Sequence, residues 1–278
     1  MDQLALAKIM MKLSALPSLP QVANRVIQLT YDPKASYDEI CEVICRDQVL
    51  TSKVLKLVNS AYYGLPRKVV TITDALTILG IETLRTMVLG VSIHKALTDH
   101  KCRSVIKRKQ LWRHATACAM ASKLLAVRLG ISESENVFIA GLLHDIGKII
   151  LSSFLSTEYS QVIDLCKQKK CSTIEAELEV LKITHSDVGM TVAEKWNLPI
   201  ILAEPIGYHH DPLHKCNYPE VVQLVYLGDI IATIAGYDSG QEVGVTISSE
   251  VLDKCDLTYS QLCMIADEIK GKISIDFL

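Results

Sequence analysis

The chain carries almost no net charge, −2 at neutral pH over 278 residues, and has no long block of lysine and arginine. Its densest basic stretch, residues 101–109, holds five cations and is typical of a solvated linker or a helix start. Proteins that bind nucleic acid present a basic patch or stripe that neutralises phosphates. We therefore expect no nucleic-acid polymer and no membrane surface among the partners.

The nine cysteines include no Cys-x-x-Cys pair, so a zinc site built from two such pairs is not expected. Cys41 and Cys45 are four residues apart and both fit the apolar face of one helix. We interpret the cysteines as reduced, mostly packed thiols of a cytosolic protein.

Signals for secretion and membrane insertion are also missing. The start, Met1-Asp2-Gln3-Leu4, lacks the charged and then apolar regions of a signal peptide. We find no apolar run of the roughly 18–20 residues that a membrane span needs. The best candidate, residues 221–235, has Asp229 near its middle. The sequence predicts a soluble, cytoplasmic protein.

Alternating strand patterns and internal repeats are almost absent, and helical periodicity dominates. Nearly half of the residues, 49%, are apolar, which is enough for a sizeable core. The sequence predicts an all-α protein of about a dozen helices. Four capping boxes mark expected helix starts, and they begin at Ser36, Ser132, Ser172 and Thr184. Expected helix stops lie at Gly64, Gly80, Gly130 and Pro199.

The polar stretch 98–109 is the one plausible internal boundary. We expect residues 1–98 to form an N-terminal helical half, 99–236 to carry the chemistry, and 237–278 to add two short closing helices. The N-terminal half contains no reactive cluster, so we assign it to packing and partner contact. Asn59 and Ser60 follow an apolar helix and are expected to cap its end.

The segment His144-Asp145-Ile146-Gly147-Lys148 interrupts the apolar run 138–143. Burying ionisable groups is costly unless they are paired or bind a metal. Further candidates lie elsewhere in helical segments, and they are His114, His185, His209, His210 and Asp229.

Five histidines and two aspartates are too many for one four-coordinate zinc, but they suit two metals that share a bridging carboxylate. The ligand types favour divalent Fe, Mn, Zn, Ni or Co. Lys148 lies one helical turn beyond His144 and could neutralise a substrate phosphate.

Each position also has an ordinary structural explanation. A single histidine at a helix start is more often a cap or a surface residue, and an aspartate in an apolar helix can be satisfied by a backbone amide. Asp211 could equally start a turn with Pro212. The remaining histidines are placed on the surface, and they are His94, His100 and His214.

The passage 142–148 resembles the signature of the HD superfamily of metal-dependent phosphohydrolases. That resemblance implies that His114, His144, Asp145 and Asp229 bind one metal. Two-metal branches add a histidine in a His-x-x-x-Gly segment and a His-His pair, which match His185 and His209-His210. Asp145 would then be the bridge between the ions.

Other segments resemble the HDOD family, the HD-related output domains of bacterial signalling proteins. They are Leu19-Pro20-Gln21-Val22-Ala23, Asp47-Gln48-Val49-Leu50, residues 57–64, 75–80 and 111–114, and Trp196-Asn197-Leu198-Pro199. The likeness runs from about residue 14 to about residue 236. It implies a multi-helical HD-superfamily fold, with an N-terminal helical subdomain packed on the HD core, and a role in signal transduction.

Three departures bear on function. The Gly-Tyr-Pro segment of the related HD-GYP phosphodiesterases, which cleave cyclic di-GMP, is altered, with Asn217 in place of glycine before Tyr218-Pro219. Gln110 stands where three-metal versions carry a glutamate, so we expect two metals. HDOD domains often have degenerate metal positions, whereas this chain keeps the whole His/Asp set.

Two functions stay open. The first is a regulatory module whose partner is a signalling protein or a small phosphorylated ligand. The alternative is an active metal-dependent phosphohydrolase or phosphodiesterase acting on a nucleotide or cyclic nucleotide, with Asp145 and Lys148 in catalytic roles.

Overall fold

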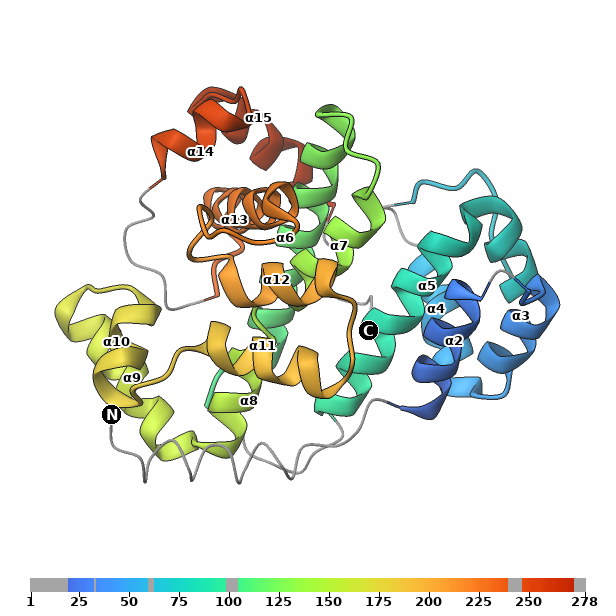
Figure 1. The fold of residues 1–278 in the computed structure, drawn as a ribbon, viewed down its shortest axis with the longest axis horizontal. Helices are drawn as coiled ribbons and strands as arrows, with labels where there is room; N and C mark the ends of the chain where they lie inside the picture. The colour runs from blue at the N-terminus through green and yellow to red at the C-terminus, as the bar shows by residue number, and fades with distance from the viewer. Residues whose placement is uncertain (1–19, 33, 60–62, 99–104, 240–246, 273–278) are drawn as a thin grey trace. The chain divides into compact units, whose positions relative to one another are not determined.

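In the computed structural model, which describes residues 20–32, 34–59, 63–98, 105–239 and 247–272, every regular element is a helix (Figure 1). The predicted all-α fold is therefore confirmed. Contacts divide these residues into two compact units, residues 20–98 and residues 105–270. Each unit is described by itself.

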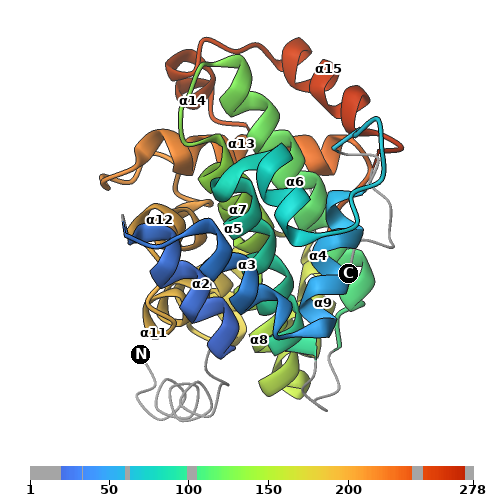
Figure 2. The same ribbon diagram turned by 90° about the vertical axis from the view of Figure 1, so that its right-hand side faces the viewer.

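The first unit is built around a long helix, α5, which the other three helices of this unit contact (Figure 2). These elements are α2 (Gln21–Tyr31), α3 (Tyr37–Cys45), α4 (Gln48–Val58) and α5 (Ile72–Thr98). Ser36 caps α3 by accepting a hydrogen bond from the Glu39 amide, as its capping box predicts. At Gly80 the helix α5 is kinked, with a φ of 81° that favours glycine, and helical structure resumes beyond it.

Asn59 ends α4 and ties the following loop to it. Its side-chain amide donates to the carbonyls of Leu55 and Val69, each at 2.7 Å, and its carbonyl accepts from the Val69 amide at 2.7 Å. The expected capping role is confirmed for Asn59, whereas Ser60 lies outside the described residues. The Asn59 side chain thus has a structural function.

The second unit holds the remaining helices. They are α6 (Arg108–Arg128), α7 (Ser134–Leu143), α8 (Ile146–Phe154), α9 (Ser156–Lys169), α10 (Thr173–Val180), α11 (His185–Lys195), α12 (Ile200–Tyr208), α13 (Pro219–Ile234), α14 (Ser249–Lys254) and α15 (Tyr259–Ile269). Helix α6 contacts α13 and α7 most extensively, and α11 contacts α12 and α8 (Figure 1). These two groups of helices surround the predicted chemical residues.

Small residues let α6 approach its neighbours closely. A Cβ atom at Gly228 of α13 would lie 1.9 Å from Ser122 Oγ, and one at Gly141 of α7 would lie 2.8 Å from the Cα of Ala119. Any larger side chain at these positions would force the helices apart. The close packing matters because Gly228 directly precedes Asp229.

In the second unit, two of the three predicted capping boxes are present at helix starts. Ser172 and Thr184 each form a complete capping box. The box expected at Ser132 is wrong, because α7 begins at Ser134 after Glu133, whose side chain makes no capping bond.

The described cysteines are all free thiols. Cys41 is buried in the first unit, but Cys45 is exposed, which corrects its predicted place on the apolar face.

By length and hydropathy, two helical segments could cross a membrane, Ile72–Ile93 and Ser134–Phe154, and neither is the run 221–235. Looking for uninterrupted apolar runs missed both. In Ile72–Ile93 the apolar 18-residue stretch is 67% buried inside the fold, and in Ser134–Phe154 it is 83% buried, as in core helices of folded domains.

Candidate metal centre

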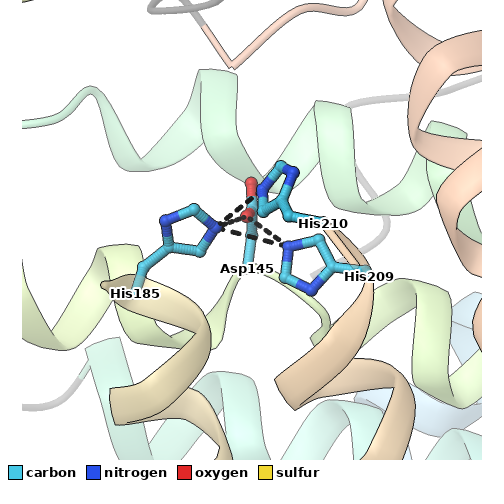
Figure 3. A group of neighbouring side chains, drawn as sticks. All are labelled: Asp145, His185, His209 and His210. Atoms are coloured by element: carbon cyan, nitrogen blue, oxygen red, sulfur yellow. Dashed lines mark hydrogen bonds and ion pairs between the residues drawn. The ribbon is translucent and has the colours of Figure 1, made fainter. Parts of the chain in front are cut away.

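The structure brings all seven predicted metal residues together inside the second unit. One group comprises His114 on α6, His144 after α7 and Asp229 on α13; the other comprises Asp145 before α8, His185 at the start of α11, and His209 and His210 after α12. Within each group, the candidate ligand atoms all lie within 4.8 Å of one another. Figure 3 shows the three imidazoles of the second group gathered around the Asp145 carboxylate.

Asp145 lies between the two groups, with one oxygen facing each. Its Oδ1 is 3.4 Å from His185 Nε2 and 3.8 Å from His209 Nε2. Its Oδ2 is 3.6 Å from His114 Nε2 and 3.5 Å from His144 Nε2. This is the arrangement of a carboxylate that can bridge two cations.

Each of the four buried imidazoles turns its Nδ1 atom toward an oxygen of the protein. The acceptors are the Tyr237 carbonyl for His114 at 2.7 Å, the Gly141 carbonyl for His144 at 2.7 Å, the Glu177 carboxylate for His185 at 2.8 Å, and the Ile206 carbonyl for His209 at 3.0 Å. A carbonyl oxygen can only accept, so Nδ1 carries the proton in three of these rings. Their Nε2 atoms face the cluster, which is how histidine ligands are commonly oriented.

The charge states in the cluster are those that metal ligands require. Burial lowers the pKa of His144, and it lowers that of His209 further, so both rings are neutral at pH 7. Burial alone would raise the pKa of Asp145, but the Lys148 ammonium beside it holds that pKa well below its usual range. Burial raises the pKa of Asp229, but the hydrogen bond and positive charge of His114, when its ring is protonated, hold that pKa below its usual range. Metal binding requires this combination of neutral imidazole and ionised carboxylate.

A buried cation would complete this donor set. The neutral His144 ring presents the lone pair of Nε2 to Asp145 Oδ2 at 3.5 Å and to Asp229 Oδ1 at 3.9 Å. In the described part of the chain, His144 Nε2 and Asp145 Oδ1 are buried and make no hydrogen bond. Unsatisfied buried polar atoms are unfavourable, and lone pairs that face carboxylates repel them. The residues therefore fit a divalent metal.

Lys148 is part of the cluster, and its ammonium is directed inward. The side chain is 1% exposed, and Nζ donates to Asp145 Oδ2 at 2.9 Å and to Ser239 Oγ at 3.4 Å. It balances one of the two ionised aspartates, which leaves the cluster with net negative charge. A divalent cation would compensate that charge.

Gly147 explains how α8 and α11 come close enough to form the site. A Cβ atom at this position would lie 1.9 Å from the carbonyl oxygen of His185. The glycine of the His-Asp signature thus places the start of α11, and with it the His185 ring, beside Asp145.

Sequence reasoning missed the carboxylate that supports His185. Glu177 of α10 is fully buried, and its Oε2 accepts from the backbone amide of His185 at 2.7 Å and from Nδ1 at 2.8 Å. Its Oε1 accepts from the Tyr159 hydroxyl at 2.8 Å. Burial and the Glu177 charge raise the pKa of Tyr159 well above its usual value, so the hydroxyl keeps its proton. The acidic run 175–179 offered no signal that singled out Glu177.

A second missed carboxylate shapes the chain after the His-His pair. Glu204 of α12 is buried and accepts from the Asn217 amide at 2.9 Å, the Asn217 side chain at 2.6 Å and the Tyr218 amide at 2.8 Å. Burial raises the pKa of Glu204, but these hydrogen bonds outweigh it and hold the pKa below its usual value. Asn217, where HD-GYP proteins have glycine, is therefore a structural partner of Glu204.

Other candidates lie outside the cluster. Asp211 is exposed and its carboxylate accepts from His214 at 3.1 Å, so it is a turn residue. The amide of Gln110 donates to Asp238 at 3.2 Å. His100 and the side chain of His94 fall outside the described residues. His210 is the exposed member of the cluster and marks where the cluster meets solvent.

Comparison with known proteins connects this geometry to a family. A sequence model of the HDOD domain matches residues 16–212. A solved HDOD domain protein of unknown function from Geobacter sulfurreducens is 26% identical, with a TM-score of 0.82 and 99% of each chain covered.

More distant solved structures share the fold. A protein from Marinobacter aquaeolei VT8, provisionally named a signal transduction protein, is 20% identical with a TM-score of 0.77, covering 98% of this chain and 64% of that one. A provisionally named phosphohydrolase from Shewanella amazonensis SB2B is 20% identical with a TM-score of 0.76, covering 98% and 97%.

A curated relative, an uncharacterized protein of Treponema pallidum, is 26% identical over 214 residues. The match covers 75% of this chain but 40% of the relative, so the chain spans about two fifths of that protein's length.

Proposed function

Because the chain belongs to the HDOD domain family, we propose that it is a regulatory signalling protein whose His/Asp cluster holds two divalent metal ions. The observation that carries the metal proposal is the buried, neutral His144 ring, whose Nε2 lone pair is directed at two ionised carboxylates. A cation between these groups turns their repulsion into attraction.

The chain's own residues divide naturally between two ions. The first ion would be held by His114, His144 and Asp229, and the second by His185, His209 and His210. Asp145 would contribute one oxygen to each. Two divalent ions, when bound, supply positive charge that can hold a phosphate or another anion between them.

A regulatory rather than catalytic role is supported by the contacts of Lys148. An enzyme that used this ammonium on a substrate phosphate would need it free to meet the substrate. In the structure it is buried and donates to Asp145. The altered Gly-Tyr-Pro segment, in which Asn217 is bound to Glu204, supports the same conclusion. The output would then be a contact with a signalling partner.

The experiment is a metal analysis combined with a hydrolysis panel. The purified protein is loaded with Mn²⁺ or Fe²⁺, its bound metal is measured, and hydrolysis of p-nitrophenyl phosphate, bis-p-nitrophenyl phosphate and cyclic dinucleotides is followed. We expect two ions per chain and no turnover. Turnover that disappears in Asp145→Ala would refute the regulatory proposal, and absence of bound metal would refute the metal centre.

A second candidate function is metal-dependent phosphate-ester hydrolysis of a nucleotide or cyclic nucleotide. The observation that favours it is that all seven candidate ligands are present and gathered in two groups, as a hydrolytic two-metal site would need. The same panel distinguishes the two functions, because only the enzyme turns over.

A further inference from the structure

A pocket of about 280 Å³ opens in the second unit beside the metal centre. It is formed by the start of α6 and the loop after α13. Its lining residues are Lys107, Lys109, Gln110, Arg113, Gly236, Tyr237 and Asp238. None of them belongs to the His/Asp cluster, so the pocket is a separate candidate site.

Cationic side chains outnumber carboxylates in the lining of this pocket. Lys107, Lys109 and Arg113 contribute three cations, against one carboxylate, Asp238, which already accepts a hydrogen bond from Gln110 at 3.2 Å. The guanidinium of Arg113 lies 5.2 Å from the centre of the Tyr237 ring, which orients it at the pocket wall. Its Nε atom is buried and makes no hydrogen bond within the described structure. Any donors that Arg113 offers to an anion in the pocket are therefore the terminal nitrogens of its guanidinium.

The position of these cations on α6 is unfavourable for the helix itself. Lys107 is the N-cap of this 21-residue helix and makes no side-chain capping bond, and the first turn contains no acidic residue. The N-terminus of a helix carries partial positive charge, so basic side chains there repel it and destabilise the helix. An anion in the pocket would be attracted by the helix terminus and by the side chains together.

We propose that this pocket binds a small molecule through a phosphate group. Phosphate matches the lining because it accepts several hydrogen bonds and carries the opposite charge to three side chains and a helix terminus. The volume fits a phosphate with a modest substituent and is just below the usual range of about 300–1,000 Å³ for small-molecule sites.

The pocket is also one hydrogen bond away from the metal centre. The carbonyl of Tyr237, a lining residue, accepts from His114 Nδ1 at 2.7 Å, and His114 follows Arg113 directly in the chain. A ligand that contacts Arg113 and Tyr237 therefore lies against the residues that orient His114. Binding itself requires no metal, so this site can be tested independently of the metal centre.

The test is calorimetric titration of the full chain, freed of metal by chelation, with inorganic phosphate and then AMP at constant ionic strength. We expect saturable binding of at least one probe. Lys107→Glu combined with Lys109→Glu should weaken it about tenfold or more, since charged hydrogen bonds contribute strongly. Lys167→Glu, which reverses an exposed charge on α9 of the same unit, should change affinity less than about twofold.

A second measurement separates a binding defect from misfolding. Acidic side chains near the start of α6 favour the helix, so the Lys107→Glu, Lys109→Glu protein without phosphate should melt no lower than the parent. Absence of binding by both probes at millimolar concentration, or an equal loss in Lys167→Glu, would overturn the proposal. A lower melting temperature in the double variant would overturn the electrostatic argument for the site.

Discussion

Replacing Glu177 by glutamine tests whether the carboxylate behind His185 holds this imidazole in the orientation that metal binding needs. The fully buried Glu177 accepts three hydrogen bonds, two from His185 at 2.7 and 2.8 Å and one from Tyr159 at 2.8 Å. Glutamine keeps the size but loses the charge, and one of its two positions becomes a donor.

The magnitude follows from the three bonds. A hydrogen bond to a charged group contributes about 1.5–3 kcal/mol and a neutral one about 1 kcal/mol, so the loss is roughly 1 kcal/mol per bond, or about 3 kcal/mol in all. For a unit of this size we expect a melting temperature about 6–12 °C lower. Partners of ligating histidines change metal affinity by about 10–100-fold when mutated.

Tyr159→Phe is the matched control, because it removes the one bond at Oε1 and leaves both bonds from His185 at Oε2 in place. It should lower stability by about 1–3 kcal/mol, through the unsatisfied carboxylate oxygen, without a comparable loss of metal affinity. Affinity is measured by competition between the protein and a chromogenic chelator for Mn²⁺, and stability by thermal melts followed by circular dichroism.

Two results would refute the reasoning. One is a folded Glu177→Gln protein with the metal affinity of the parent, which would mean that His185 needs no carboxylate to bind metal. The other is a Tyr159→Phe protein that loses as much affinity as Glu177→Gln, which would make the effect one of general stability.

Four further predictions concern the same unit. Asp145→Asn should abolish metal binding and lower the unfolding free energy by about 3–5 kcal/mol, because it leaves the Lys148 ammonium buried beside a neutral amide. Adding Lys148→Met to this variant should recover much of the stability but should not restore metal binding. A double variant as unstable as Asp145→Asn alone would contradict this prediction. Gly147→Ala should lower stability by about 3 kcal/mol or more and reduce bound metal, since its Cβ would lie 1.9 Å from the His185 carbonyl; an unchanged melt would disprove the close approach. A chelator that removes the metal should lower the melting temperature, by the equivalent of about 2.7 kcal/mol for a metal at 100 times its dissociation constant; the check is a melt with metal removal verified. The pKa of Glu204 is lower in the folded protein than its ordinary value of 4.5, so its contribution to the unfolding free energy is present above pH 4.5 and is lost as the pH falls through the folded pKa. The difference in unfolding free energy between the parent and Glu204→Gln, measured by urea unfolding, should therefore be largest near pH 7 and should shrink below pH 4.5.

The all-α fold was predictable because helical periodicity depends on residues that are close together in the sequence. Caps at Ser172 and Thr184 were correctly placed, since both the N-cap residue and its acidic partner three residues later are present. The same pattern at Ser132 failed because α7 starts two residues later, and the pattern alone does not fix which residue becomes the N-cap. Cys45 failed for a related reason: spacing of four puts two residues on one face but does not say how far burial extends along it.

The gathering of the His/Asp residues could be anticipated only by resemblance, because their spacing in sequence spans more than a hundred residues. What brings them together is packing at small side chains, such as Gly228 against Ser122, and this depends on three-dimensional neighbours. Glu177 could not be singled out, because a buried glutamate and an exposed one look alike in a helix that carries several acids. Glu204 is the one acid of the otherwise apolar helix α12, and this was a signal that the sequence did offer. Their function is visible only from the partners they accept hydrogen bonds from.

Lys148 shows that the position of a residue on a helix face does not determine its binding partner. Helical spacing placed its ammonium near the cluster and suggested a substrate phosphate as its partner, whereas in the structure the partner is a carboxylate of the chain itself. The Coulomb term decides between them: at 2.9 Å in a buried site the attraction to Asp145 is strong, and both charges lose water if they separate. A substrate phosphate would have to replace that contact and leave Asp145 compensated by other cations. The Lys148 ammonium is therefore first of all the partner of the Asp145 carboxylate.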